Sequence, residues 1–159
     1  LKQAYKSACI KQNKNRKELI IDNLNKLESI NKKVLIVAHA YNIHDDYIGK
    51  IITINLEKYN IEYIYSDLFN KVADLCFYLA PNLYWKYSKE SIGAISYCKE
   101  NIDGIIFIST FPCGVDSLVN ELVMRKIDLP YLNLIIDDLD AEAGIETRIE
   151  SFVDIIEQD

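Results

Sequence analysis

The 159-residue chain has few residues that break or link secondary structure, with only five glycines and three prolines. It contains no internal repeat, no low-complexity tract and no Pro/Gly-rich linker, which argues against a repeat array or a string of flexibly linked modules. No apolar run approaches the roughly 20 residues that cross a bilayer, and the first residues lack the apolar core of a signal peptide. We therefore expect no membrane partner and a cytoplasmic location.

Several motifs of nucleotide and hydrolase sites are also missing. The sequence contains no G-x-G-x-x-G, no G-x-x-x-x-G-K-[ST] and no G-x-S-x-G, so a dinucleotide fingerprint, a P-loop and a nucleophile elbow are excluded. Basic residues do not cluster with an aromatic platform, and the net charge is −6 with a pI near 5.0. This charge balance indicates that nucleic acid is not a partner.

The four cysteines lie far apart in the sequence, and no C-x-x-C occurs. This spacing predicts neither a disulfide framework nor a zinc site, and it is typical of a reduced intracellular protein. Cys76 and Cys98 fall within helical patterns beside apolar neighbours, so we expect both in the core. Cys9 lies in a polar segment and has no expected role, which leaves Cys113.

Apolar runs alternate with helical periodicity along the chain. The runs predict buried strands, the first, third and fourth covered on both faces and the second at an edge; they are 34–38, 61–65, 104–109 and 131–136. Amphipathic stripes predict the helices between them. These stripes are Leu19, Ile20, Leu24, Leu27 and Ile30; Tyr47, Ile48, Ile51, Ile52 and Leu56; Ile92, Ile95 and Tyr97; Val115, Leu118, Val119, Leu122 and Val123; and Ile145, Ile149, Phe152, Val153 and Ile156. A shorter helix is expected between Asp67 and Leu79.

This alternation predicts an α/β protein with a three-layer, Rossmann-like domain. Four parallel strands in the order 2-1-3-4 would carry helices on both faces. We expect one domain over 1–159, with an N-terminal helical segment (1–30) before the βα core (31–159) and a hinge or frayed start at Lys11–Lys17. Because Leu1 is not an initiator methionine, we expect the chain to be a piece of a longer protein.

In such sheets, ligands bind beyond the carboxyl ends of the strands, where the strand order reverses. The sequence places four loops there, at 39–46, 66–67, 110–116 and 137–144. Cys113 lies between Pro112 and Gly114, where a strand leads into a helix. Free N–H groups at a helix start favour a thiolate or an anionic cluster. The alternative is a packing cysteine at a tight turn.

Polar side chains in the other loops allow two interpretations each. His39 and His44 suit proton transfer, metal binding or a substrate hydrogen bond, or they only pack within the loop. Asp45 and Asp46 are placed to cap the next helix. The acidic cluster of Asp137, Asp138, Asp140 and Glu142 suits a hard cation, but we favour helix capping together with an ion pair from Arg148 to Asp137 or Asp138.

Four segments together resemble activase-related proteins of the 2-hydroxyacyl-CoA dehydratase and benzoyl-CoA reductase superfamily. LIVAHAYNIHDDYI (35–48) resembles a G-H-P-Y-N loop, and PNLYWKYSKESIGA (81–94) resembles an L-Y-W-x-Y helix start. DGIIFISTFPCGVDSLVNELVMRK (103–126) resembles a strand ending in F-G-C-G-P-D-S, and NLIIDDLDAEAGIETRIESFVDII (133–156) resembles I-D-E-x-x-x-E-A-G-x-x-T-R-x-E-A-F-x-D. Around Cys113, Pro112 and Val115 depart from the usual Gly and Pro.

The resemblance implies a subunit or domain that shares a [4Fe–4S] cluster and works with an ATP-dependent activase. Cys113 would be one cluster ligand, and the cleft would accept part of an acyl-CoA. The side chains implied around that cleft are His39, Tyr41, Asn42, Asp116, Ser117, Asp137 and Arg148, with Arg148 and Glu150 in the signature helix. Because a cluster needs about four ligands, we expect no cluster in this chain alone.

Three functions follow as hypotheses. The first is a redox-related domain of a radical-type acyl-CoA dehydratase, a lyase, or of its activating component, with partners in another subunit or in other domains of the same chain. The second is a non-catalytic module that docks on an activase or dehydratase partner, with Cys113 a packing residue. The third is a small-molecule or nucleotide site formed by the loops at 39–46 and 137–144.

Overall fold

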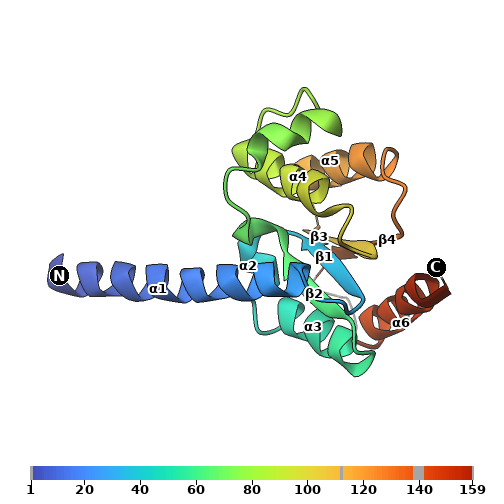
Figure 1. Ribbon diagram of the computed structural model, residues 1–159, viewed down its shortest axis with the longest axis horizontal. Coiled ribbons are helices and arrows are strands. Elements are labelled where there is room, and N and C mark those ends of the chain that lie inside the picture. Colours follow the sequence, from blue (N-terminus) through green and yellow to red (C-terminus); the bar gives the residue numbers. More distant parts are fainter. Residues whose placement is uncertain (1, 112, 138–141, 159) are drawn as a thin grey trace.

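Four parallel strands form the centre of the molecule in the order β2-β1-β3-β4 (Figure 1). The computed structural model describes residues 2–111, 113–137 and 142–158. The strands are β1 (Lys33–Val37), β2 (Glu62–Tyr65), β3 (Gly104–Thr110) and β4 (Tyr131–Ile136), and every neighbouring pair is parallel. The predicted α/β class, strand order and three-layer, Rossmann-like arrangement are confirmed.

Helices cover both faces of the sheet, as right-handed crossovers require. On one face lie α4 (Lys86–Cys98) and α5 (Gly114–Met124), and on the other lie α3 (Ile48–Lys58) and α6 (Glu142–Gln158) (Figure 1). The short α2 (Ala40–Ile43) follows β1, and the long α1 (Lys2–Leu27) precedes it. Over the described residues, no helix combines the length and the apolar character needed to span a membrane.

Two hydrophobic cores lie on the two sides of the sheet, because alternate side chains of a strand point to opposite faces. Leu35, Val37, Ile105 and Phe107 enter the core beneath α4 and α5. Val34, Ile36, Ile106 and Ile108 enter the core beneath α3 and α6. The central strands β1 and β3 are therefore buried almost throughout, as their continuous apolar runs predicted.

The last strand, β4, does not match the prediction that it is covered on both faces. Leu134 and Ile136 are buried on the α6 side, whereas Tyr131 and Ile135 are 46% and 45% exposed. The strand ends the sheet, and α5 packs over β3 rather than over β4. An apolar run alone did not distinguish this half-covered edge from a central strand.

Segment 67–79 and helix α5 also differ in detail from the sequence prediction. Instead of one short helix, the chain forms two 3₁₀ helices, η1 (Ser66–Leu68) and η2 (Ala73–Tyr78). In α5, Val119 and Val123 are buried, but Leu118 and Leu122 are exposed. The buried stripe is thus narrower than the apolar pattern, since only one side of α5 contacts the sheet.

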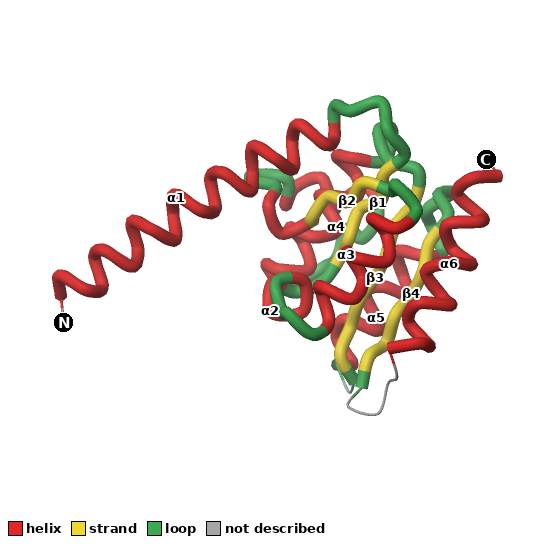
Figure 2. Tube along the Cα trace, turned by 90° about the horizontal axis from the view of Figure 1, so that it is seen from below, coloured by secondary structure: helices red, strands yellow, loops and turns green. Residues whose placement is uncertain are grey.

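Helix α1 is continuous from Lys2 to Leu27, so the predicted hinge at Lys11–Lys17 is wrong. Its first half projects from the sheet into solvent (Figures 1 and 2). Of the predicted apolar stripe only Leu27 is buried, and Ile30 lies beyond the helix and is fully exposed. The stripe failed because much of the helix surface faces solvent, and because its contacts with the body include polar ones, from Arg16 to Asp67 and from Asn23 to Tyr65.

That polar residue is Asn23, which is 3% exposed. Its Nδ2 donates to the carbonyl of Tyr65 at 3.2 Å, and its Oδ1 accepts from the Tyr65 N–H at 2.7 Å. The amide thus takes the place of a neighbouring strand along the outer edge of β2. This satisfies backbone groups that a buried sheet edge would otherwise leave unpaired.

Replacing Asn23 by alanine should lower the free energy of unfolding by about 1–3 kcal/mol, because the buried Tyr65 N–H and C=O lose their partner. Urea unfolding followed by circular dichroism measures this change. Asn13→Ala is the matched control, since Asn13 is exposed on the same helix. Equal losses in both variants would contradict the edge-pairing role of Asn23.

Candidate functional site

The carboxyl ends of β1 and β3 carry the polar residues of the candidate site. From β1 the chain proceeds to β2 on one side of it, and β3 then pairs on the other side, so the strand order reverses between β1 and β3. Loops diverge at such a point and leave room for side chains. His39 follows β1, and Cys113 and Asp116 follow β3.

His39 and Asp116 form the central contact of the site. The distance from His39 Nε2 to Asp116 Oδ2 is 3.2 Å, with the two side chains 25% and 10% exposed. Asp116 lies in the first turn of α5, where a carboxylate is favoured by the helix dipole. The structure thus brings together two predicted site residues that are 77 positions apart in the sequence.

Two tyrosines flank the His39 ring. The Tyr87 ring stacks on it with centroids 3.6 Å apart and planes inclined by 16°, and the Tyr41 ring stacks at 5.0 Å and 12°. Burial, together with the negative charges of Asp116 and Asp67, raises the pKa of Tyr87, although the nearby Ser91 hydroxyl lowers it somewhat. Tyr87 therefore stays a neutral hydroxyl group at physiological pH.

Beneath His39 lies a small polar cavity of about 10 Å³. Its apolar wall includes Val37 and Ile108, and its polar wall is formed by His39, Tyr87, Ser88, Ser91, Asp116 and Asn120. This volume is that of one water molecule. An acyl group does not fit inside it, so any larger ligand must bind on the solvent side of His39.

Cys113 is the N-cap residue of α5 and is half-buried. Its N–H donates to the Thr110 carbonyl at 2.8 Å, and its own carbonyl accepts from the N–H and hydroxyl of Ser117 at 3.2 and 2.9 Å. These bonds fix the backbone of the turn, and the Cys113 side chain makes no hydrogen bond to the helix start. The hydroxyl of Ser117 is used within the helix, away from the cavity.

Each end of the short helix α2 contacts an aspartate from another element, Asp116 of α5 at its start and Asp67 of η1 at its end. His39 is its N-cap and His44 its C-cap, and His44 Nε2 lies 3.3 Å from Asp67 Oδ2. Arg16 of α1 donates to the Asp67 carbonyl at 2.6 Å. His44 is thus exposed and paired with Asp67, and its packing role stays a prediction. Asn42, inside α2, is almost fully buried.

The start of α3 and the two core cysteines agree with the sequence predictions. Asp45 Oδ1 accepts from the N–H groups of Tyr47 and Ile48 at 2.8 and 2.9 Å, which confirms Asp45 as the cap of α3. Cys76 and Cys98 are buried in the core as predicted. Burial raises the pKa of the Cys98 thiol to about 12 and also raises that of Cys76.

The acidic cluster after β4 falls mostly outside the described residues, since Asp138 and Asp140 belong to the gap at 138–141 and the Glu142 side chain is not described. Asp137 is exposed. Arg148 donates through Nη2 to the carbonyl of Asn133 in β4. This contact ties α6 to the edge of the sheet, and the predicted ion pair from Arg148 stays a prediction.

Tyr87, Ser91 and Asn120 are site residues that the sequence did not single out. A signal for Tyr87 existed, because it is the second tyrosine of the L-Y-W-x-Y-like helix start. Ser91 follows one turn later on the same side of α4. Asn120 had no signal, since a lone polar residue within the stripe of α5 is indistinguishable from a solvent-facing one.

No group of three or more His, Cys, Asp or Glu side chains within the described ranges is placed to hold a metal ion. Cys113 is the one half-buried thiol at the carboxyl edge among those residues, since Cys9 lies on α1 and the other two are in the core. As a donor set these residues do not fit a complete [4Fe–4S] cluster, which takes about four ligands. They fit the contribution of one thiolate to a cluster completed elsewhere.

Alanine at position 49 should displace α2 from its place beside the site. A Cβ on Gly49 would lie 1.8 Å from the carbonyl oxygen of Ile43, so the backbone has to move, at a loss of about 1–3 kcal/mol in unfolding free energy. Urea unfolding and the amide NMR shifts of His39 and Tyr41 measure the effect. Gly114→Ala is the control, because no atom lies within 4 Å of its added Cβ; a Gly49→Ala variant as stable as this control would contradict the packing.

Comparison of the chain with protein-family models, with curated proteins and with solved structures gives no match. The α/β architecture is established by the strand order and pairings of the structure itself. The resemblance to the dehydratase superfamily rests on the four sequence segments alone and stays a prediction.

Proposed function

We propose that this chain is a redox-related α/β domain of a 2-hydroxyacyl-CoA dehydratase-like or activase-related protein. In this proposal Cys113 supplies one thiolate to a [4Fe–4S] cluster shared with another subunit or domain. The observation that carries the proposal is the placement of Cys113, half-buried at the N-cap of α5 and at the carboxyl end of β3. A deeply buried Cys113 would instead have indicated a packing residue.

The other cysteines support this assignment by contrast. Cys76 and Cys98 are buried, and the raised pKa values of their thiols oppose formation of the thiolate that binds iron. Cys9 lies in the first half of α1, which projects from the sheet (Figure 1). The missing ligands would therefore come from a partner such as a dehydratase subunit, with an ATP-dependent activase as the electron donor.

A bound cluster would supply one-electron transfer, and the chain's own residues would shape the surroundings. The N–H groups at the start of α5 stabilise negative charge beside Cys113. His39, oriented by Asp116, lies at the same edge of the sheet and is partly open to solvent. An acyl-CoA would bind on the solvent side of His39, since the cavity beneath it is the size of one water molecule.

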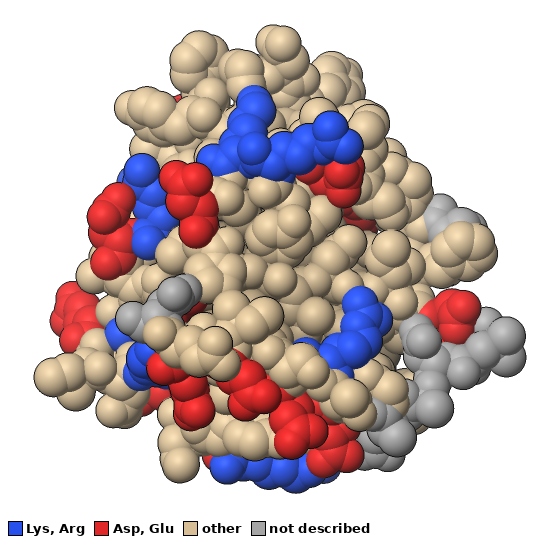
Figure 3. All heavy atoms as spheres, turned by 90° about the vertical axis from the view of Figure 1, so that its right-hand side faces the viewer, with Lys and Arg blue, Asp and Glu red and all other residues tan. Residues whose placement is uncertain are grey.

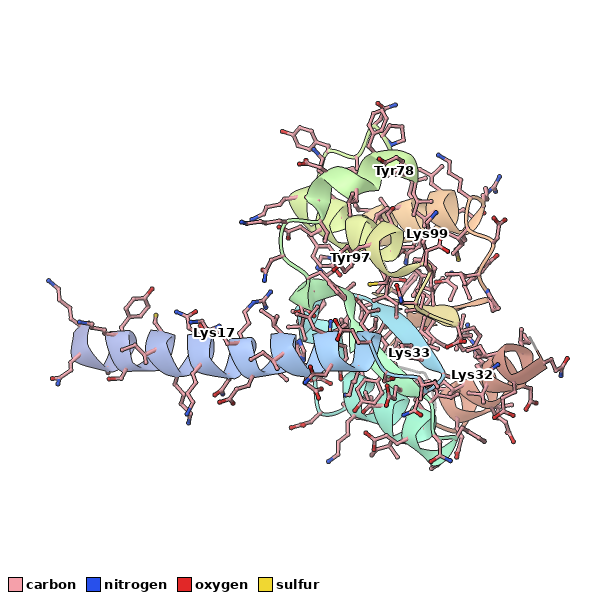
Figure 4. The ribbon with its side chains drawn as sticks, in the orientation of Figure 1. Lys17, Lys32, Lys33, Tyr78, Tyr97 and Lys99 are labelled. Atoms are coloured by element: carbon pink, nitrogen blue, oxygen red, sulfur yellow. The ribbon has the colours of Figure 1, made fainter. Side chains whose placement is uncertain are left out.

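Exposed aromatic side chains favour a second candidate, a docking module for the same kind of partner. Four large aromatic side chains, from the end of η2 to the N-cap of α4, are 47–85% exposed; they are Phe77, Tyr78, Tyr84 and Trp85. Tyr78, labelled in Figure 4, is the last residue of η2 and is largely exposed. Clustered exposed aromatics are typical of protein–protein interfaces.

Anaerobic reconstitution of the complete protein with its partner subunit tests the cluster proposal. Cys113→Ser should remove most of the iron and the visible absorption, whereas Cys9→Ser should leave both unchanged. If iron content and absorption survive Cys113→Ser, the ligand role is wrong. Co-purification with the partner that is unaffected by Cys113→Ser but lost in a Phe77→Ser/Tyr84→Ser variant would favour the docking module.

A further inference from the structure

Three buried polar atoms around the cavity beneath His39 have no hydrogen-bond partner in the described part of the chain. They are Tyr87 Oη, Ser91 Oγ and Asp116 Oδ2. Ser91 is 3% and Asp116 8% exposed, so bulk water does not reach these groups freely. The two hydroxyls lie near each other without good hydrogen-bond geometry. Buried polar groups are almost always paired, which indicates that a small polar ligand belongs in the space between them.

The small volume of the cavity indicates that this ligand is a water molecule. At about 10 Å³ it accepts one water molecule and nothing larger. A buried water makes two to four hydrogen bonds, and two hydroxyls and one carboxylate oxygen around this cavity lack a partner. Since a hydroxyl both donates and accepts while a carboxylate only accepts, one water can satisfy all three at once.

The Asp116 contact also determines which imidazole nitrogen of His39 carries the proton. Asp116 Oδ2 lies 3.2 Å from Nε2 without hydrogen-bond geometry, and its negative charge favours the tautomer with hydrogen on Nε2. The other nitrogen, Nδ1, has no partner within the described residues and is left with a lone pair. Stacking between Tyr41 and Tyr87 restrains rotation of the ring.

We propose that this crevice is a hydrated acid–base site, in which one buried water joins Tyr87, Ser91 and Asp116 and in which His39 presents Nδ1 as a proton acceptor. A proton taken up at Nδ1 from a bound ligand converts the ring to imidazolium, and the charge is balanced by the Asp116 carboxylate. The water completes the hydrogen bonding of that carboxylate. The site needs no cluster, so it stands independently of the role of Cys113.

Long-range ¹H–¹⁵N NMR of the imidazoles tests the His39 tautomer. The chain has only two histidines, and each places Nε2 next to an aspartate. We expect His39 with hydrogen on Nε2 and an unprotonated Nδ1 shift. Asp116→Asn should change the His39 pattern alone, and the matched Asp67→Asn should change only His44. Hydrogen on His39 Nδ1 in the unmodified chain would overturn the proposal.

Magnetic relaxation dispersion, which counts long-lived internal waters, tests the ligand. Ser91→Val fills the cavity with an apolar group and should remove one such water. Ser96→Val on the same helix is the control, because the Ser96 hydroxyl donates to the Ile92 carbonyl rather than facing the cavity. An unchanged water count in Ser91→Val would overturn the hydrated site.

A separate observation concerns the projecting half of α1. From Lys2 to Asn15 every side chain except Cys9 is exposed, and side chains radiate from the helix on all sides (Figure 4). Residues 2–17 contain six basic and no acidic side chains, whereas all 24 acidic and the other 12 basic residues follow, giving that part a net charge of −12. Acidic side chains line the lower rim of the opposite end of the molecule (Figure 3).

Three exposed apolar residues of this helix share one face, whereas Tyr5 and Leu19 are exposed on the opposite side. Ile10, Ile21 and Leu24 are 62%, 59% and 40% exposed, and spacings of 11 and 3 residues place them on one face. An uncovered helix of this polar composition is marginally stable in water. A partner that covers this face has to offer apolar contacts together with negative charge near the tip.

We propose that the partner is a second copy of this chain, with the two α1 helices paired antiparallel. Antiparallel pairing puts the basic first half of one helix beside the second half of the other, which contains Glu18 and Asp22. About a centre near residue 16, Lys14 lies opposite the partner copy's residue 18, and Ile10 lies near residues 21–24. Parallel pairing would instead place the two basic halves together. Such a contact is two-fold symmetric and closes on itself.

Sedimentation velocity over a range of protein and salt concentrations tests this dimer. Lys14→Glu should weaken dimerisation at least several-fold, and adding Glu18→Lys in the same chain should restore it, because the swapped charges again face each other. Lys50→Glu, an exposed change on α3, should have no such effect. A monomer at every concentration, or binding of α1 to nucleic acid without dimers, would overturn the proposal.

Discussion

The parallel pairing of β1 with β3 places Val34 opposite Gly104 and Val37 opposite Phe107, and the remaining structure is arranged around it. Both strands are buried on both faces, so their backbone groups depend on each other for hydrogen bonds. Gly104 allows the side chain of Phe152 in α6 to lie where a Cβ would be only 2.8 Å from its ring. The missing side chain at Gly104 therefore lets α6 pack closely against β3.

The same pairing of β1 with β3 positions the residues of the candidate site. Because β1 and β3 end side by side, His39 and Asp116 leave the sheet at one edge and meet across it. The two tyrosine rings that stack on His39 are Tyr41 of α2 and Tyr87 of α4. Four separate elements thus fix one imidazole, and this is a higher degree of restraint than a loop histidine usually has.

The sequence predicted the parts of the molecule that depend on local pattern. Continuous apolar runs identified β1 and β3, and the order of strands and helices gave the sheet topology. The pattern failed where tertiary contacts decide, as at β4, whose outer half has no covering helix, and at α1, whose inner end is fixed by Asn23. The convergence of the loops after β1 and β3 was predictable, but the partnership of Tyr87 with His39 was not, since it depends on how α4 crosses the sheet.

The Asn23 amide has a consequence for the assembly of the sheet. By occupying the backbone groups of Tyr65, it closes the β2 side to any additional strand, including one from an aggregating neighbour. On the β4 side the Arg148 guanidinium donates to the Asn133 carbonyl, and Ile135 stays exposed on the uncovered face of the strand. Side chains thus occupy backbone groups on both outer strands, at Tyr65 in β2 and at Asn133 in β4, so the addition of a fifth strand is opposed at both ends of the sheet.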